Sequence, residues 1–109
     1  DDRASGEARR MIRRVEWSDD AADDFDQAID YIARESEKNA RRVSSRILAA
    51  IDLLAELPTG RQGRVAGTHE KLARNTPYIV AYKVTDSAIF VVRIIHGSRD
   101  WPEGEWPAE

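Results

Sequence analysis

The stretch YIVAYKVTDSAIFVVRIIH, residues 78–96, decides the fold of this chain. It holds two runs rich in β-branched and aromatic residues, 78–85 and 88–96, with only Asp86 and Ser87 between them. Residues of these types favour strands, and a polar pair between two such runs is typical of a tight chain reversal. The stretch therefore predicts a β-hairpin.

A helix is predicted upstream of the hairpin, over residues 39–57, because this segment carries an apolar stripe at helical spacing. Pro58 and Gly60 follow it and are expected to end the helix, since proline cannot extend the hydrogen-bond ladder. Ile47 and Leu54 lie in the stripe and are predicted to be core residues.

Another helix is predicted nearer the N-terminus, from Ser18 to about Ser36. Ser18 is a suitable N-cap, and the aspartates after it suit the positive end of a helix dipole, which explains them better than catalysis does. Phe25 and Ile29 are expected in the core. Only a few residues, 37–39, separate the two helices, so they should form an antiparallel hairpin.

Three shorter segments complete the expected fold. Residues 12–17 and 69–74 are predicted strands, and residues 61–67 are a predicted loop that carries glycine and arginine. The chain is therefore expected to be an α+β protein: an N-terminal strand, an antiparallel helical hairpin, and a three-stranded antiparallel meander. The helices would cover one sheet face, which gives a two-layer sandwich.

The other sheet face has no helix left to cover it. On the last strand, Arg93 is expected to share a face with Ile89, Val91 and Ile95. A mixed apolar and basic face of this kind predicts a surface that binds a partner.

Domain boundaries follow from composition. Residues 11–102 are expected to form one domain, in a chain with 41% hydrophobic and 34% charged residues. Residues 1–10 contain no large apolar side chain and are predicted to be a disordered N-terminal extension. Residues 103–109 are expected to be an acidic tail.

Several classes of site are excluded by composition. Cysteine is absent and the two histidines, His69 and His96, are far apart in sequence, so no metal site is expected. No glycine-rich phosphate loop follows a strand, and no cofactor is expected. No apolar stretch approaches the roughly 18–20 residues that a membrane span needs. We therefore expect a cytoplasmic protein that does not bind membranes.

Charge is distributed unevenly along the chain. Residues 18–37 hold eight acids and one base, whereas residues 58–101 hold seven bases and three acids. This asymmetry predicts two different binding surfaces, with ordinary solvated charge as the alternative.

The basic half is expected to concentrate its side chains at one end of the sheet: Arg74, His96 and Arg99, with Arg61, Arg64 and His69 nearby. Guanidinium groups bind phosphates in bidentate fashion, and a histidine can act as acid or base on a phosphodiester. Such a patch could cut RNA, hold nucleic acid, or hold an acidic protein surface. A purely structural or solubilising edge is the remaining alternative.

Three motifs, LARNTPYIVAYKV (72–84), AIFVVRIIHGSRDWP (88–102) and LPTGRQGRV (57–65), resemble the RelE/ParE superfamily of bacterial toxins. The resemblance spans about residues 11–102. It implies the same element order as above. It also implies a cognate antitoxin whose C-terminal arm wraps the toxin, in a hetero-oligomer.

The superfamily divides by mechanism: RelE-like members cleave messenger RNA on the ribosome, and ParE-like members poison DNA gyrase. Arg74 and Arg99 match positions of RelE-type arginines, but the paired lysines are reduced to Lys71 and the C-terminal tyrosine is absent. The HGSRDWP ending resembles ParE more closely. The resemblance therefore implies a toxin that inhibits gyrase, has no enzyme activity of its own, and is neutralised by a ParD-like antitoxin.

Two alternatives stay open at this point: a ribonuclease that uses Arg74, His96 and Arg99, and a detoxified module that only binds an antitoxin. Trp101 is expected mainly to pin the C-terminal segment onto the sheet. The residues expected to contact the target or the antitoxin are Arg61, Arg64, Arg74, Arg93, Arg99 and Trp101.

Overall fold

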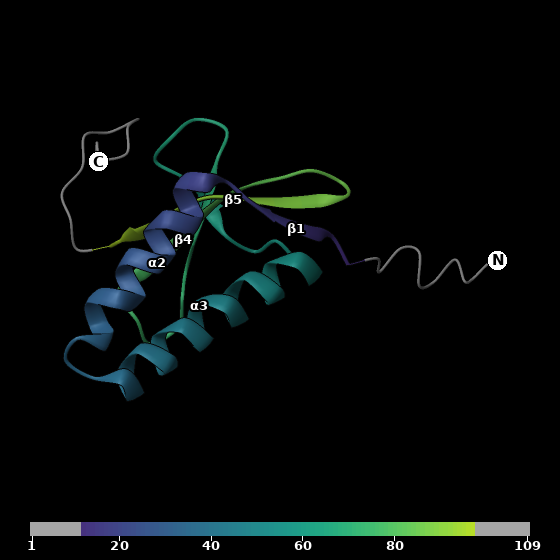
Figure 1. Cartoon of the computed structure of the whole chain (residues 1–109). Coiled ribbons are helices and arrows are strands. Elements are labelled where there is room, and N and C mark those ends of the chain that lie inside the picture. The colour runs from purple at the N-terminus through teal and green to yellow at the C-terminus, as the bar shows by residue number, and fades with distance from the viewer. Residues whose placement is uncertain (1–11, 98–109) are drawn as a thin grey trace.

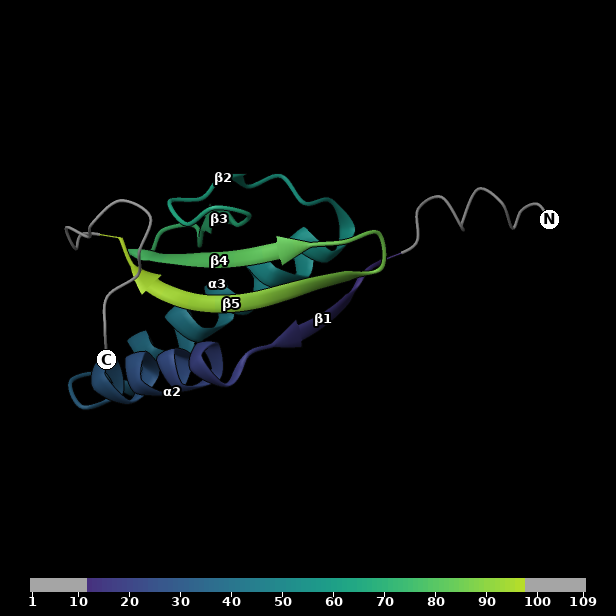
Figure 2. The ribbon, with the colours of Figure 1, turned by 90° about the horizontal axis from the view of Figure 1, so that it is seen from above.

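The computed structural model describes residues 12–97 and shows two helices packed against one face of a five-stranded sheet (Figure 1, Figure 2). The elements in chain order are β1 (Arg14–Trp17), α2 (Asp19–Ala33), α3 (Glu37–Glu56), β2 (Arg61–Gln62), β3 (His69–Leu72), β4 (Tyr78–Val84) and β5 (Ala88–His96). The expected extension 1–10 and the expected tail 103–109 lie outside the described residues.

The sheet has the strand order β1-β5-β4-β3-β2. Its centre is the predicted hairpin, because β4 pairs antiparallel with β5, and β3 pairs antiparallel with β4 to complete the expected meander. The N-terminal strand β1 lies parallel to β5. The α+β prediction is confirmed.

One segment differs from the prediction. Residues 61–67 were expected to be loop throughout, yet Arg61 and Gln62 form the edge strand β2 and pair with Glu70 and His69 of β3. Two residues carry too little periodicity to be recognised as a strand, and only the pairing with β3 defines them.

Serine caps set the start of both helices. The Ser18 hydroxyl accepts a hydrogen bond from the Ala21 N–H at 3.0 Å, so Ser18 caps α2 as predicted. The Ser36 hydroxyl likewise accepts from the Asn39 N–H at 3.0 Å. Because Ser36 is a cap, α3 begins at Glu37, two residues earlier than the apolar stripe indicated.

The core lies between the helical hairpin and the sheet. Ile47 and Leu54 of α3 are fully buried, and Tyr82 of β4 is the largest fully buried side chain. Phe25 and Ile29 of α2 are partly buried and pack against this cluster. All four predicted core residues therefore contribute to it. Within residues 12–97, neither helix combines the length and apolar character that crossing a membrane requires.

A β-bulge in β5 changes which side chains face the helices. Tyr82 pairs with Val91, whereas Ala81 pairs with Arg93, so Val92 is an extra residue. The inserted residue reverses the alternation: Val91 and Ile94 both belong to the core, and Arg93 lies opposite Ala81 on the other face. The expectation that Arg93 shares a face with Val91 is therefore wrong.

Candidate functional site

Charged side chains line up across the sheet face that is turned away from the helices. Strand register places Arg61 beside Glu70, Glu70 beside Ala81, and Ala81 beside Arg93. Directly paired residues of neighbouring strands share a face of the sheet. We call the charged members of this line, together with their ion-pair partners Arg64 and Asp24, the charged row.

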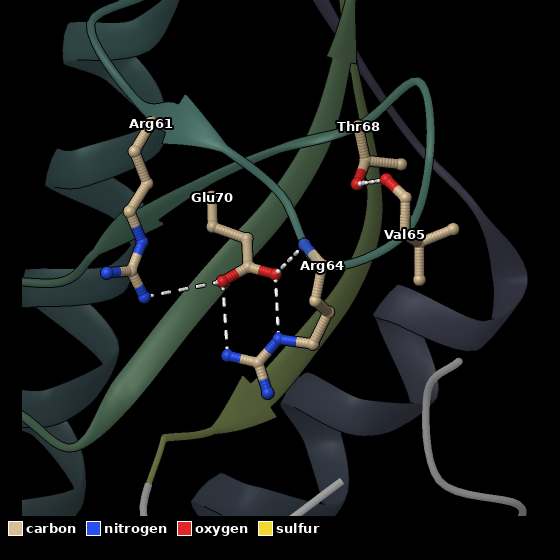
Figure 3. Close-up of polar contacts among 5 residues, drawn as sticks. All are labelled: Arg61, Arg64, Val65, Thr68 and Glu70. Atoms are coloured by element: carbon tan, nitrogen blue, oxygen red, sulfur yellow. Dashed lines mark hydrogen bonds and ion pairs between the residues drawn. The ribbon is translucent and has the colours of Figure 1, made fainter. Parts of the chain in front are cut away.

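Glu70 is the centre of one half of the charged row (Figure 3). Its carboxylate accepts from the Arg64 side chain at two points, Nε at 2.8 Å and Nη2 at 3.1 Å, and from the Arg64 backbone N–H at 2.9 Å. The Glu70 side chain is only 2% exposed, and that of Arg64 is 22% exposed. Arg61 approaches Glu70 at 3.6 Å from an exposed position.

The turn between β2 and β3 positions Arg64 for this contact. The Thr68 hydroxyl donates to the Val65 carbonyl at 2.6 Å (Figure 3). The Gly63 N–H donates to the Thr68 carbonyl at 2.8 Å. A Cβ atom at Gly63 would lie 2.4 Å from the Thr68 hydroxyl, so the turn requires glycine there. Gly67 has a φ of +82°, in the region that favours glycine.

Two opposing effects act on the acidity of Glu70. Burial raises the pKa of this carboxyl, but hydrogen bonds from the Arg64 side chain and backbone, with the charges of Arg64 and Arg61, outweigh burial and lower the pKa below its usual value. Glu70 is therefore ionised at neutral pH. A carboxylate held in this way is a poor proton donor.

Asp24 and Arg93 form the other half of the charged row. Arg93 donates to the Asp24 carboxylate through Nε at 2.8 Å and Nη2 at 3.0 Å, and both side chains are 12% exposed. The same carboxylate accepts from the Ile94 backbone N–H at 3.0 Å. Asp24 thus joins α2 to β5 just beyond the point where β1 stops pairing with β5.

The sequence did not reveal this role of Asp24. Asp24 belongs to the same run of aspartates as Asp19 and Asp20, which lie in the first turn of α2. Its one distinguishing signal is a position one turn further along the helix, where a capping explanation is weaker. Arg64 and Arg93 were expected to face a partner; both also hold a buried carboxylate.

The expected basic cluster is divided between two places. Arg74 lies exposed in the turn between β3 and β4, and His96 ends β5 opposite Tyr78, with the two rings 5.3 Å apart. The charged row crosses β4 at Ala81, which is three residues, or about 10 Å, along the strand from Tyr78. Arg74 and His96 therefore share one end of the sheet, whereas Arg61, on the edge strand β2, lies level with Ala81, partway along β4.

The remaining predicted residues lie elsewhere. His69 stacks on the buried Tyr82 ring at 5.6 Å, away from the charged row. Burial raises the pKa of the Tyr82 phenol. The hydrogen bond that the phenol oxygen accepts from the Gly60 N–H lowers the pKa by a smaller amount. Arg99 and Trp101 lie outside the described residues. Among residues 12–97, no group of three or more metal-ligating side chains is found.

Comparison with protein families finds one match over most of the chain. The family described as "ParE toxin of type II toxin-antitoxin system, parDE" matches residues 15–101. This range contains every described residue of the charged row, as well as Arg74 and His96.

Two sequence relatives cover nearly their whole length. Y4kP of Sinorhizobium fredii is 33% identical over 92 residues, which cover 84% of this chain and 95% of Y4kP. Toxin RelE2 of Caulobacter vibrioides is 37% identical over 89 residues, which cover 81% of this chain and 99% of RelE2.

Two solved structures share the fold. A chain of the chromosomal ParDE toxin–antitoxin system from P. aeruginosa superimposes with a TM-score of 0.69 at 21% identity, over 78% of this chain and 96% of that one. A chain of the E. coli DinJ–YafQ toxin–antitoxin complex gives a TM-score of 0.51 at 19% identity, over 77% and 91%. At these identities the likeness concerns the fold alone.

Proposed function

Because this chain belongs to the ParE toxin family of type II toxin–antitoxin systems, we propose that it inhibits DNA gyrase and that a cognate ParD-like antitoxin neutralises it. The family match over residues 15–101 is the observation that carries the proposal. The likeness to a chain of a ParDE system adds support at the level of the fold.

The chemistry of the charged row supports binding over bond cleavage. Each of its two carboxylates accepts a bidentate pair of hydrogen bonds from an arginine, Glu70 from Arg64 and Asp24 from Arg93. The pKa of the paired Glu70 carboxyl is lowered by Arg64, so this group stays ionised at neutral pH and is a poor general acid. A surface of this kind holds a partner through charge and shape, which is what a gyrase inhibitor requires.

The proposed contact surface includes the predicted basic residues. Arg61 and Arg74 are both exposed, and Arg61 stays 73% exposed although it approaches Glu70, so we assign the first contacts to them. Arg64 and Arg93 would contribute through the exposed rims of their ion pairs, and Arg99 and Trp101 complete the proposed set. An acidic antitoxin segment would be attracted to the same surface, because complementary charge speeds association and fixes orientation.

One observation favours a second candidate function, ribosome-dependent cleavage of messenger RNA. The relative RelE2 carries a RelE name, and Arg74 and His96 lie at the same end of the sheet. In this alternative Arg74 and Arg99 would hold the phosphates and His96 would transfer a proton. We propose gyrase inhibition first, because the family that matches is described as ParE, and ParE-like members act on gyrase according to the resemblance given above.

Both candidates place the protein in the cytoplasm and predict growth arrest when it is made without its antitoxin. The test is conditional expression in a bacterium, followed by plasmid topology and by primer extension on abundant messages. We expect arrest with relaxed plasmid and intact messages. The double variant Arg61→Ala with Arg74→Ala should arrest growth less, and the matched control Arg14→Ala with Arg34→Ala should arrest it fully.

Cleaved messages together with normally supercoiled plasmid would instead support the ribonuclease. If the double variant and its control arrest growth equally, Arg61 and Arg74 are not part of the contact surface.

A further inference from the structure

A second basic surface lies where α3 passes the turn between β3 and β4. Arg42 donates through Nη1 to the Asn75 carbonyl at 3.0 Å, and Arg46 donates through Nη1 to the Arg74 carbonyl at 3.5 Å. These contacts bring two helix arginines against the turn that carries the exposed Arg74. Lys38 stands one helical turn before Arg42 on the same side of α3. We call Lys38, Arg42, Arg46 and Arg74 the basic ridge.

The charges of the basic ridge are not neutralised by neighbouring acids. Within residues 12–97, the structure records ion pairs for Arg14, Arg61, Arg64 and Arg93, and none for a member of the ridge. Arg42 and Arg46 donate to backbone carbonyls and to the Asn39 side chain, which are neutral acceptors. The guanidinium groups are therefore held in place with their positive charge uncompensated.

This arrangement works against the stability of α3. Lys38, Arg42 and Arg46 follow one another at intervals of four residues, and like charges at that spacing repel. Lys38 also lies in the first turn of α3, where the helix dipole disfavours cations. The same dipole adds to the positive potential that an anion would meet. Unfavourable features gathered in one place are typical of a binding site.

The ridge has the chemistry of a phosphate-backbone contact. All four of its side chains are cationic, whereas the centre of a protein interface is normally apolar. It also lacks the aromatic platforms on which single strands stack. Lys38 and Arg46 are about 12 Å apart along the helix, a length over which duplex DNA presents about seven negative charges. Four cations on a rigid ridge fit that charge density.

We infer that the basic ridge binds the sugar-phosphate backbone of duplex DNA without reading its sequence. This activity lies beyond the proposed gyrase inhibition and needs neither gyrase nor an antitoxin. It would hold the protein on the polymer on which its proposed target works. The net charge of the whole chain is −3, so binding depends on the local ridge and falls steeply as salt rises.

The test is fluorescence anisotropy of a labelled mixed-sequence DNA duplex titrated with the purified full chain at several salt concentrations. We expect a dissociation constant of about 1–100 µM near physiological salt, with a linear fall of log K against log salt. The triple variant Arg42→Gln, Arg46→Gln, Arg74→Gln should reduce the magnitude of the slope of log K against log salt by about 2.7, since each lost phosphate contact removes about 0.9.

Two further variants keep this test independent of folding. Arg74→Gln alone removes a side chain that forms no hydrogen bond or ion pair with other residues of the range 12–97, and it should reduce the slope of log K against log salt by about 0.9. The control Arg14→Gln, Arg34→Gln, Lys83→Gln removes the same total charge elsewhere and should leave the slope nearly unchanged. The inference is overturned if the chain fails to bind duplex at low salt, if the control loses as much slope as the ridge variant, or if only single-stranded RNA binds.

Discussion

Replacement of Glu70 by glutamine is expected to destabilise the protein strongly, because it removes the negative charge and one of the two acceptor oxygens around which the turn between β2 and β3 is organised. Glu70 accepts three hydrogen bonds from Arg64, at 2.8, 2.9 and 3.1 Å, and its side chain is 2% exposed. Loss of one partner from a buried ion pair costs about 3–5 kcal/mol. Arg64 is 22% exposed and can recover some hydration, so we expect about 3 kcal/mol.

The assay is urea unfolding followed by circular dichroism, with Arg61→Gln as the matched control. Arg61 reaches the same carboxylate only at 3.6 Å and is 73% exposed, so its loss should cost less than about 1 kcal/mol. A cost of 3 kcal/mol corresponds to a fall in Tm of roughly 12–24 °C for a domain of this size. If Glu70→Gln unfolds within about 0.5 kcal/mol of the wild type, the assignment of Glu70 as a buried anchor is refuted.

The same residue predicts how stability depends on pH. The folded-state pKa of Glu70 is lowered, so its contribution to the free energy of unfolding is fully present above the unfolded-state pKa and disappears as pH falls through the folded-state pKa. Acid should therefore narrow the difference in stability between wild type and Glu70→Gln. A difference that stays constant from pH 7 to about pH 2 would contradict this sign.

Two further substitutions test the local geometry. Asp24→Asn loses the charge that pairs with Arg93 at 2.8 Å, and should cost about 2–3 kcal/mol in urea unfolding; an unchanged midpoint would mean that the pair adds nothing to stability. Gly63→Ala places a Cβ atom 2.4 Å from the Thr68 hydroxyl and should lower the free energy of unfolding by about 1–3 kcal/mol. The double variant Gly63→Ala, Thr68→Ser should lose as much or more, because serine keeps the clashing oxygen. Full stability of the single variant would show that the turn can relax.

The sequence was sufficient for the elements whose signal is local. The two runs of the hairpin, the apolar stripe of α3 and the Ser18 cap each carry their own pattern, and all three are found as predicted. Family resemblance in the C-terminal half pointed to the toxin superfamily, which the family match confirms.

The sequence was insufficient where long-range pairing decides the outcome. The bulge at Val92 depends on how β4 and β5 align, and no residue near it marks the extra position. The contact of Asp24 with Arg93 joins residues 69 positions apart. Arg42 and Arg46 lie in α3, far from Arg74 in sequence, and only tertiary packing brings them to the turn at Arg74.

Inhibition of purified DNA gyrase measures the central claim most directly. Relaxed plasmid, gyrase and ATP are mixed with increasing amounts of the full chain, and supercoiled product is quantified by electrophoresis. We predict a dose-dependent loss of supercoiling that is weakened in the Arg61→Ala, Arg74→Ala variant. Undiminished supercoiling at saturating amounts of folded chain would contradict the account.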